Sequence, residues 1–151
     1  MKLAEALIER ADLQKKIAQL EVRMQQNVKV QEGDTPAESV EELLPQYESL
    51  MDRLELLIVS INRTNGAAAF DTMTLAEAIT KRDCLKSKIH AYRELYEATS
   101  ISQDRYSNKE IRFVRCVDAA KLQNQIDSMS KAYRELDTKM QGINWTIELL
   151  E

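Results

Sequence analysis

Polar side chains that could bind an anion gather in two places outside the regular apolar pattern of the chain. The first place is the run 62–65, where an arginine stands among three hydrogen-bonding side chains. The second lies between residues 105 and 115, where arginines stand near aromatic residues. Arginine presents a fork of donors that matches phosphate and carboxylate groups, and binding residues are concentrated in loops. The candidate ligand- or partner-binding residues are Asn62, Arg63, Thr64, Asn65, Arg105, Tyr106, Arg112 and Arg115.

These residues also have a purely structural interpretation. Arg63 could bind the last carbonyl groups of a preceding helix, and Asn65 or Gly66 could end that helix in the left-handed conformation. If Arg112 and Arg115 lie on an extended segment, their side chains face opposite ways and need not act together. Helix capping and an anion or partner site therefore both remain open.

The residues needed for catalysis are scarce. His90 is the only histidine, and the residue three positions before it is Ser87, so the Glu-x-x-His motif of di-iron bundles is absent. His90 and Glu94 are four positions apart, which is typical of a simple helix contact. Three glycines do not form a phosphate-binding loop. We therefore expect no catalytic residues, no metal ligands and no cofactor.

The composition sets the class of protein. The chain has 151 residues, 30% of them charged, with three glycines and two prolines. Few helix breakers and many charges are typical of one helical domain, here spanning 1–151. A net charge of −4 gives no reason to expect a nucleic-acid partner.

Localisation is predicted from what the sequence lacks. No apolar run resembles a secretion signal or reaches membrane-spanning length, which predicts a cytoplasmic protein. Cys84 and Cys116 have no metal-ligand spacing and are most simply two reduced thiols, with a disulfide as the alternative.

One apolar stripe dominates the C-terminal part of the chain. Large apolar residues recur there at alternating spacings of four and three, which keeps them on one face of a long helix. Such a seam requires a second helix, either within one bundle or in another subunit, and we favour a homo-oligomer. The predicted seam consists of Leu122, Ile126, Met129, Tyr133, Leu136, Met140, Ile143, Ile147 and Leu150.

Similar spacings predict three further helices. The first covers about 2–32, and a capping box with proline at the first helical position, 35–38, begins the second. Pro45 predicts either a kink or a true start near Leu44. A loop follows at 62–66, and a second capping box at 74–77 begins a third helix that ends near Ser100.

The segment 111–117 is rich in β-branched and aromatic residues, which favours an extended strand paired with 67–70. A helix beginning at a capping box in 107–110 is the alternative. The predicted fold class is mainly all-α, with four long helices in an antiparallel bundle or coiled-coil hairpins. It includes a minor two-stranded β element near 67–70 and 111–117.

Several stretches resemble a known family. They are the opening 1–14, the run 61–65, the tetrapeptide 104–107, and the ending 133–137 with 144–150. These segments are similar to the small bacterial helical proteins known as septicolysin, and the resemblance extends over the whole chain. It implies a bacterial helical protein whose function is not established, and the family name implies a pore-forming cytolysin. The resemblance supplies no catalytic or binding residues.

These patterns favour an uncharacterised bacterial coiled-coil or helical-bundle protein that acts as a homo-oligomeric intracellular scaffold or binding module. One alternative is a septicolysin-like pore-forming cytolysin, which would make a membrane the partner. The charged helix faces and the acidic net charge are unlike those of membrane-surface helices. A second alternative is an anion- or nucleotide-binding helical bundle whose small-molecule ligand is unknown.

Overall fold

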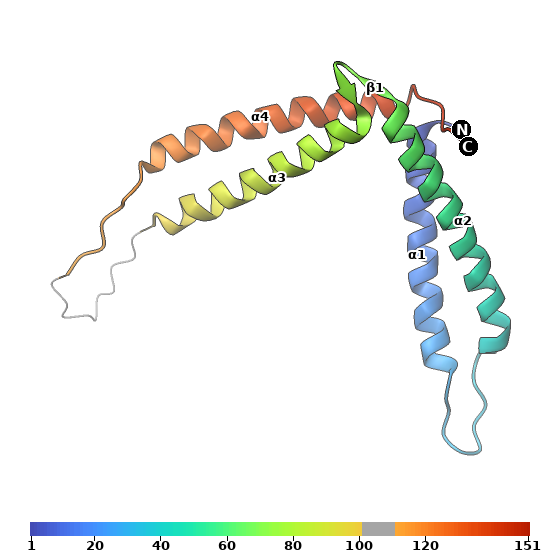
Figure 1. Ribbon diagram of the computed structural model, residues 1–151. Coiled ribbons are helices and arrows are strands. Elements are labelled where there is room, and N and C mark those ends of the chain that lie inside the picture. Colours follow the sequence, from blue (N-terminus) through green and yellow to red (C-terminus); the bar gives the residue numbers. More distant parts are fainter. Residues whose placement is uncertain (101–110) are drawn as a thin grey trace. The chain divides into compact units, whose positions relative to one another are not determined.

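The computed structural model describes residues 1–100 and 111–151. These ranges contain four long helices and one short two-stranded antiparallel sheet (Figure 1). The helices are α1 (Leu3–Asn27), α2 (Val40–Ala67), α3 (Leu75–Ala98) and α4 (Ala119–Asn144), and the strands are β1 (Ala69–Phe70) and β2 (Met73–Thr74). The predicted fold class, mainly all-α with a minor two-stranded β element, is confirmed.

The chain divides into two compact units. The first consists of Met1–Ala76 with Gln141–Glu151, and the second of Glu77–Met140. The first contains α1 and α2, and the second contains most of α3 and α4. The single-domain organisation stays a prediction.

The helices α1 and α2 form a closely packed antiparallel pair (Figure 1). Their apolar residues at spacings of three and four are turned toward each other and buried, as the periodicity predicts. Burial of one such side chain contributes about 1.5–3 kcal/mol. Arg53 donates two hydrogen bonds to the carboxylate of Glu9, from Nε at 2.7 Å and from Nη2 at 3.0 Å, and so links the two helices along one edge. The buried residues are Leu13, Ile17, Leu20, Leu43, Leu54, Leu57 and Ile61.

The predicted end of the first helix and start of the second are both wrong by several residues. Helix α1 ends at Asn27, whose amide nitrogen donates to the carbonyl of Arg23 at 2.8 Å. The amide oxygen of Asn27 accepts the backbone N–H of Glu38 at 3.1 Å, and the Glu38 carboxylate binds Arg23 at 2.9 Å. The predicted capping box at 35–38 therefore does not form, because both polar groups of Glu38 are engaged by α1.

Helix α2 begins at Val40, with Ser39 as the flanking residue. Pro45 lies inside the helix, so the alternative of a start near Leu44 is wrong. Proline has no N–H to donate to the carbonyl four residues earlier, which here belongs to Glu41. Because the helix already has its first turn before Pro45, one missing bond does not prevent it from forming.

The predicted loop at 62–66 is also wrong, because α2 continues through it to Ala67. The N–H of Ala68 closes the last turn by donating to the carbonyl of Thr64 at 2.8 Å. Thr64 is 1% exposed and follows Ile61 at the spacing of the buried seam. Because the run 62–65 is polar, it lacks the apolar spacing from which a helix is predicted.

A tight hairpin follows α2. Ala69 pairs with Thr74 and Phe70 with Met73, and Asp71 in the turn has a φ of 53°. The two-stranded element is confirmed near Phe70, but its second strand is Met73–Thr74 and not 111–117. The third helix begins at Leu75 after Thr74, as predicted, and ends at Ala98, close to the predicted Ser100.

In the second unit, α3 and α4 run beside each other (Figure 1). Ile89 of α3 and Ile126 of α4 are buried in the middle of the helices. Arg82 occupies a position in the apolar spacing of α3 and donates to Asp137 of α4 at 3.2 Å. Burial opposes the charge of Arg82, but the neighbouring carboxylates of Asp83 and Asp137 hold its pKa above the ordinary value.

Helix α4 begins after Asp118, whose carboxylate accepts the N–H of Lys121 at 3.2 Å, so the predicted cap at Asp118 is confirmed. The helix ends at Asn144. The prediction that it continues through Ile147 and Leu150 is wrong. Instead, Leu3 donates to the carbonyl of Ile147 at 2.9 Å, in an antiparallel pairing with the start of the chain.

The residues 111–117 have no regular secondary structure. Their large apolar side chains are exposed, Phe113 to 84% and Val114 to 78%. The predicted strand pairing of this segment is therefore wrong, and the alternative capping box at 107–110 lies outside the described residues.

Candidate functional site

The polar run 62–65 binds the chain's own C-terminal segment. Thr64 Oγ1 donates to the carbonyl of Ser60 at 2.7 Å and accepts the backbone N–H of Leu150 at 2.9 Å. Arg63 donates to the backbone carbonyl of Glu151. Arg63 thus binds a carbonyl of the C-terminal segment and not the last carbonyls of α2 that the capping interpretation predicts. Asn62 and Asn65 flank these contacts on the same helix.

A second set of contacts joins the two ends of the first unit. Lys2 Nζ lies 2.5 Å from one carboxylate oxygen of Glu148, and the amino group of Met1 lies 3.3 Å from the other. The hydrogen bond from Lys2, and then that from the amino group, lower the pKa of Glu148. Leu149 donates to the carbonyl of Met1 at 2.8 Å. Sequence reasoning missed this pairing because no local signal connects residues so far apart.

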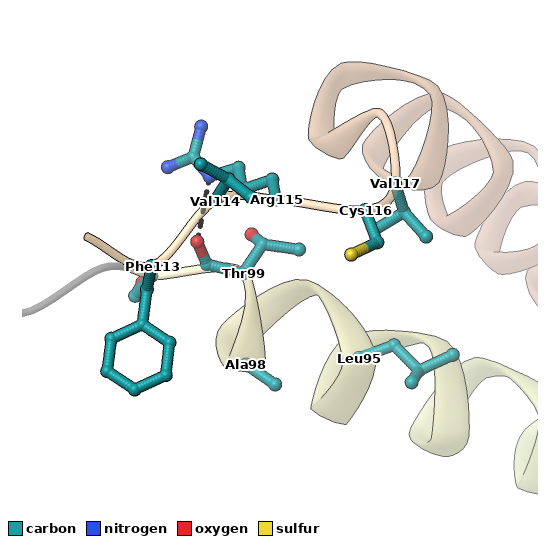
Figure 2. Close-up of a pocket in the computed structure, with 9 residues that line it drawn as sticks. Leu95, Ala98, Thr99, Phe113, Val114, Arg115, Cys116 and Val117 are labelled. Atoms are coloured by element: carbon teal, nitrogen blue, oxygen red, sulfur yellow. Dashed lines mark hydrogen bonds between the residues drawn. The ribbon is translucent and has the colours of Figure 1, made fainter. Parts of the chain in front are cut away.

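Arg112 and Arg115 lie in the second unit. Arg115 Nε donates to the carbonyl of Thr99 at 2.8 Å, just beyond the end of α3 (Figure 2). Arg115 therefore satisfies a carbonyl near a helix end, as the capping interpretation predicts, and Arg112 is exposed on the same segment. Arg105 and Tyr106 lie outside the described residues.

The segment around Arg115 borders a pocket of about 460 Å³. Its walls are largely apolar and come from the last turn of α3 and the segment 113–117 (Figure 2). Leu95, Phe113 and Val114 contribute to it, and all three are exposed. Cys116 also borders it, and both Cys116 and Cys84 are exposed and unbonded.

A second cavity, of about 440 Å³, lies between α3 and α4. Ile89 and Tyr133 give it an apolar part, and basic side chains from both helices surround them. The cavity is lined by Lys86, Ile89, His90, Arg93, Ser130, Tyr133 and Arg134. Sequence reasoning missed this site, although Lys86 and Arg93 are seven positions apart and so share one face of a helix next to the seam residue Ile89.

Within the described ranges 1–100 and 111–151, no group of three or more His, Cys, Asp or Glu residues could hold a metal ion. His90 Nε2 lies 3.4 Å from Glu94 on the same helix, the simple contact that the spacing predicts. Among the helices that the structure describes, none is long and apolar enough to cross a membrane.

The predicted oligomer seam is only partly buried. Ile126 and Met140 are buried at 4% and 2% exposure. Leu122, Met129, Tyr133, Leu136 and Ile143 are partly exposed on α4, and so is Ile147 beyond its end, while Leu150 is exposed. The seam residues up to Ile143 lie on α4.

Comparisons with other proteins give a fold and a family. The model of a protein family of unknown function (DUF6847) matches residues 10–149. A crystal structure of a functionally unknown conserved protein from Corynebacterium diphtheriae is similar to this chain, with 40% identity and a TM-score of 0.92 over 99% of each chain. The search of curated proteins found no match. Neither match states a lytic activity, so the lysin alternative stays a prediction.

Proposed function

The chain belongs to this family of unknown function, DUF6847, and because neither match states an activity, we propose from its own helices that it is a non-catalytic helical scaffold that self-associates. The observation that supports this proposal is the incomplete burial of the apolar seam between α3 and α4. An apolar stripe on a soluble helix is stable in water only when another surface covers it.

The two helix pairs differ in how well they cover their seams. Along α1 and α2 the seam is buried from Leu13 to Leu20 on one helix and from Leu54 to Ile61 on the other. Along α3 and α4, Ile89, Ile126 and Met140 are buried, but most other seam positions are not. The partly exposed positions of this seam are Leu85, Tyr92, Leu122, Met129, Tyr133 and Leu136.

The exposure of apolar side chains increases toward the C-terminal end of α3 and the segment that precedes α4. Leu95 is 55% exposed and Tyr96 39% exposed on the last turns of α3. Phe113 and Val114 beside them are more exposed still. Single exposed apolar residues are ordinary, but a group of neighbouring ones marks a surface that contacts another molecule.

A second copy of the same chain fits this surface. Its α3 and α4 carry the same spacing of apolar residues, so two pairs can combine into a four-helix arrangement in which each covers the other. A contact between two identical surfaces closes on itself as a dimer, the commonest form of homo-oligomer. Arg82, paired with Asp137 inside this seam, is a polar seam residue of the kind that fixes helix register.

The test is the mass of wild type and two variants in solution, measured by light scattering after size exclusion. Leu136→Asp places a charge on a partly exposed seam residue, and Leu56→Asp places one on a residue of α2 that is 65% exposed. We expect a wild-type mass of at least twice the 17.4 kDa of one chain. Leu136→Asp should reduce it to a single chain with helicity retained by circular dichroism, and Leu56→Asp should not.

The proposal fails if Leu136→Asp and Leu56→Asp have the same effect on a multimeric wild type, because the seam is then not the interface. A wild type that is a single chain at every concentration would also contradict it. Tyr92→Asp, at a partly exposed seam position of α3, gives a second variant in case Leu136→Asp does not fold.

A further inference from the structure

The cavity between α3 and α4 combines positive charge with an apolar surface. Lys86, His90 and Arg93 reach it from α3, and Arg134 reaches it from α4. Ile89 and Tyr133 supply its apolar lining. All of these residues belong to the second unit, Glu77–Met140, so the cavity is complete within that unit.

Three basic side chains of this cavity form no ion pair with any residue that the structure describes. Among residues 1–100 and 111–151, Lys86, Arg93 and Arg134 form no ion pair within 4.0 Å. Other basic groups of the same helices do form one: Arg82 with Asp137 and Lys131 with Glu135. Charges of one sign that gather on one surface raise the local concentration of counter-ions.

The hydroxyl group of Ser130 adds a second, independent observation. Its Oγ is shielded from solvent and has no hydrogen-bond partner in the part of the chain that the structure describes. A serine inside a helix can hydrogen-bond to the carbonyl four residues earlier, and buried polar groups nearly always find a partner. Because Ser130 lines the cavity, a hydroxyl group without a partner among the described residues lies at its wall.

We infer that this cavity is a binding site for a small organic anion, a molecule with a phosphate or carboxylate group on an apolar or aromatic body. Arg93 and Arg134 would bind the anionic group, since the guanidinium fork matches both oxygens of such a group. Tyr133 and Ile89 would contact the apolar body. A volume of about 440 Å³ lies in the range of small-molecule sites.

The test is isothermal titration of the full-length chain with three probes: phenyl phosphate, inorganic phosphate and phenol. We expect phenyl phosphate to bind more tightly than either part alone, because it uses the charged and the apolar sides of the cavity together. Its affinity should fall with added salt, because the charges act partly through solvent. Because Tyr133 belongs both to this cavity and to the seam of the proposed self-association, the titration is made on wild type and on Leu136→Asp, so that a failure to bind and a failure to associate are distinguishable.

Matched variants locate the site. Arg93→Gln and Arg134→Gln should each weaken binding of phenyl phosphate about tenfold or more, because each removes a hydrogen bond between charged groups. Lys88→Gln removes the same charge from an exposed position on α3 that does not line the cavity. Its affinity should stay within about twofold of wild type, since screening weakens distant surface charges.

The hydroxyl group has its own pair of variants. Ser130→Ala should weaken binding several-fold, while Ser128→Ala, at an exposed position two residues earlier, should leave the affinity unchanged. Three results would overturn the inference. They are no binding of phenyl phosphate, equal binding of phenol, and an effect of Lys88→Gln as large as that of Arg134→Gln. The last would show attraction to the general charge of the helix.

Discussion

Thr64 accepts a hydrogen bond from the backbone N–H of Leu150 at 2.9 Å, across 86 positions of the sequence. The same hydroxyl group donates to the carbonyl of Ser60, so both of its hydrogen-bonding functions are used. Thr64 is 1% exposed. One buried hydroxyl group thus attaches the C-terminal segment to the last turns of α2.

Replacement of Thr64 by valine keeps the shape of the side chain and removes this attachment. We expect Thr64→Val to lower the free energy of unfolding by about 1–3 kcal/mol, because the N–H of Leu150 loses its partner in a shielded place. Thr64→Ser keeps the hydroxyl group and should lose less. Urea unfolding checks this, and a valine variant as stable as wild type would contradict it.

Glu148 makes the contact between the chain ends depend on pH. Lys2 and the amino group of Met1 lower the pKa of Glu148 below its ordinary value of 4.5. A lowered folded-state pKa gives stability that is present above the unfolded value and lost as the pH falls through the folded value. We therefore expect Glu148→Gln to melt below wild type at neutral pH and to match it in acid.

The control for this prediction is Glu135→Gln. Glu135 forms an exposed contact with Lys131 at 3.9 Å on one helix, and such contacts contribute little. Melting temperatures of the three proteins from neutral to acidic pH provide the test. A constant difference between Glu148→Gln and wild type at every pH would show that ionisation of Glu148 is not the cause.

Two adjacent leucines test the packing of α1 on α2. Leu57 is 2% exposed and Leu56 is 65% exposed. We expect Leu57→Ala to reduce the free energy of unfolding by about 2–5 kcal/mol, because it leaves a cavity in the core. Leu56→Ala should stay within about 0.5 kcal/mol of wild type. Similar losses for both variants in denaturant titrations would contradict the observed packing.

The lysin alternative makes a separate prediction about membranes. Insertion of these helices would carry charged side chains into the bilayer, at a cost of about 2.5–3.5 kcal/mol for each one at its centre. We therefore expect no dye release from anionic lipid vesicles at neutral or mildly acidic pH, with a pore-forming peptide as the positive control. Strong release at low protein concentration would favour the cytolysin over the scaffold.

Much of the fold could be predicted from the sequence because it follows from local apolar spacing. The alternation of three and four places Leu54, Leu57 and Ile61 on one face of α2, and they are buried there. The same spacing wrongly extends α4 through Ile147 and Leu150. The helix ends before these two residues, and the segment that contains them pairs with the start of the chain. A local pattern contains no information about so distant a partner.

The candidate sites show the same limit. The polar neighbours of Thr64 predict a loop, yet Thr64 follows Ile61 at the three-residue spacing of the buried face. The shared face of Lys86 and Arg93 can be predicted from their spacing of seven. That Arg134 joins them cannot, because it depends on how far α3 and α4 are shifted along each other.

The most direct test of the proposed scaffold is sedimentation equilibrium of the unmodified chain over a range of concentrations. The account predicts a mass that is a whole multiple of 17.4 kDa and decreases toward the single chain on dilution. This behaviour would show reversible association of the kind that the partly exposed seam of α3 and α4 requires. A mass of 17.4 kDa at every concentration would contradict the proposal.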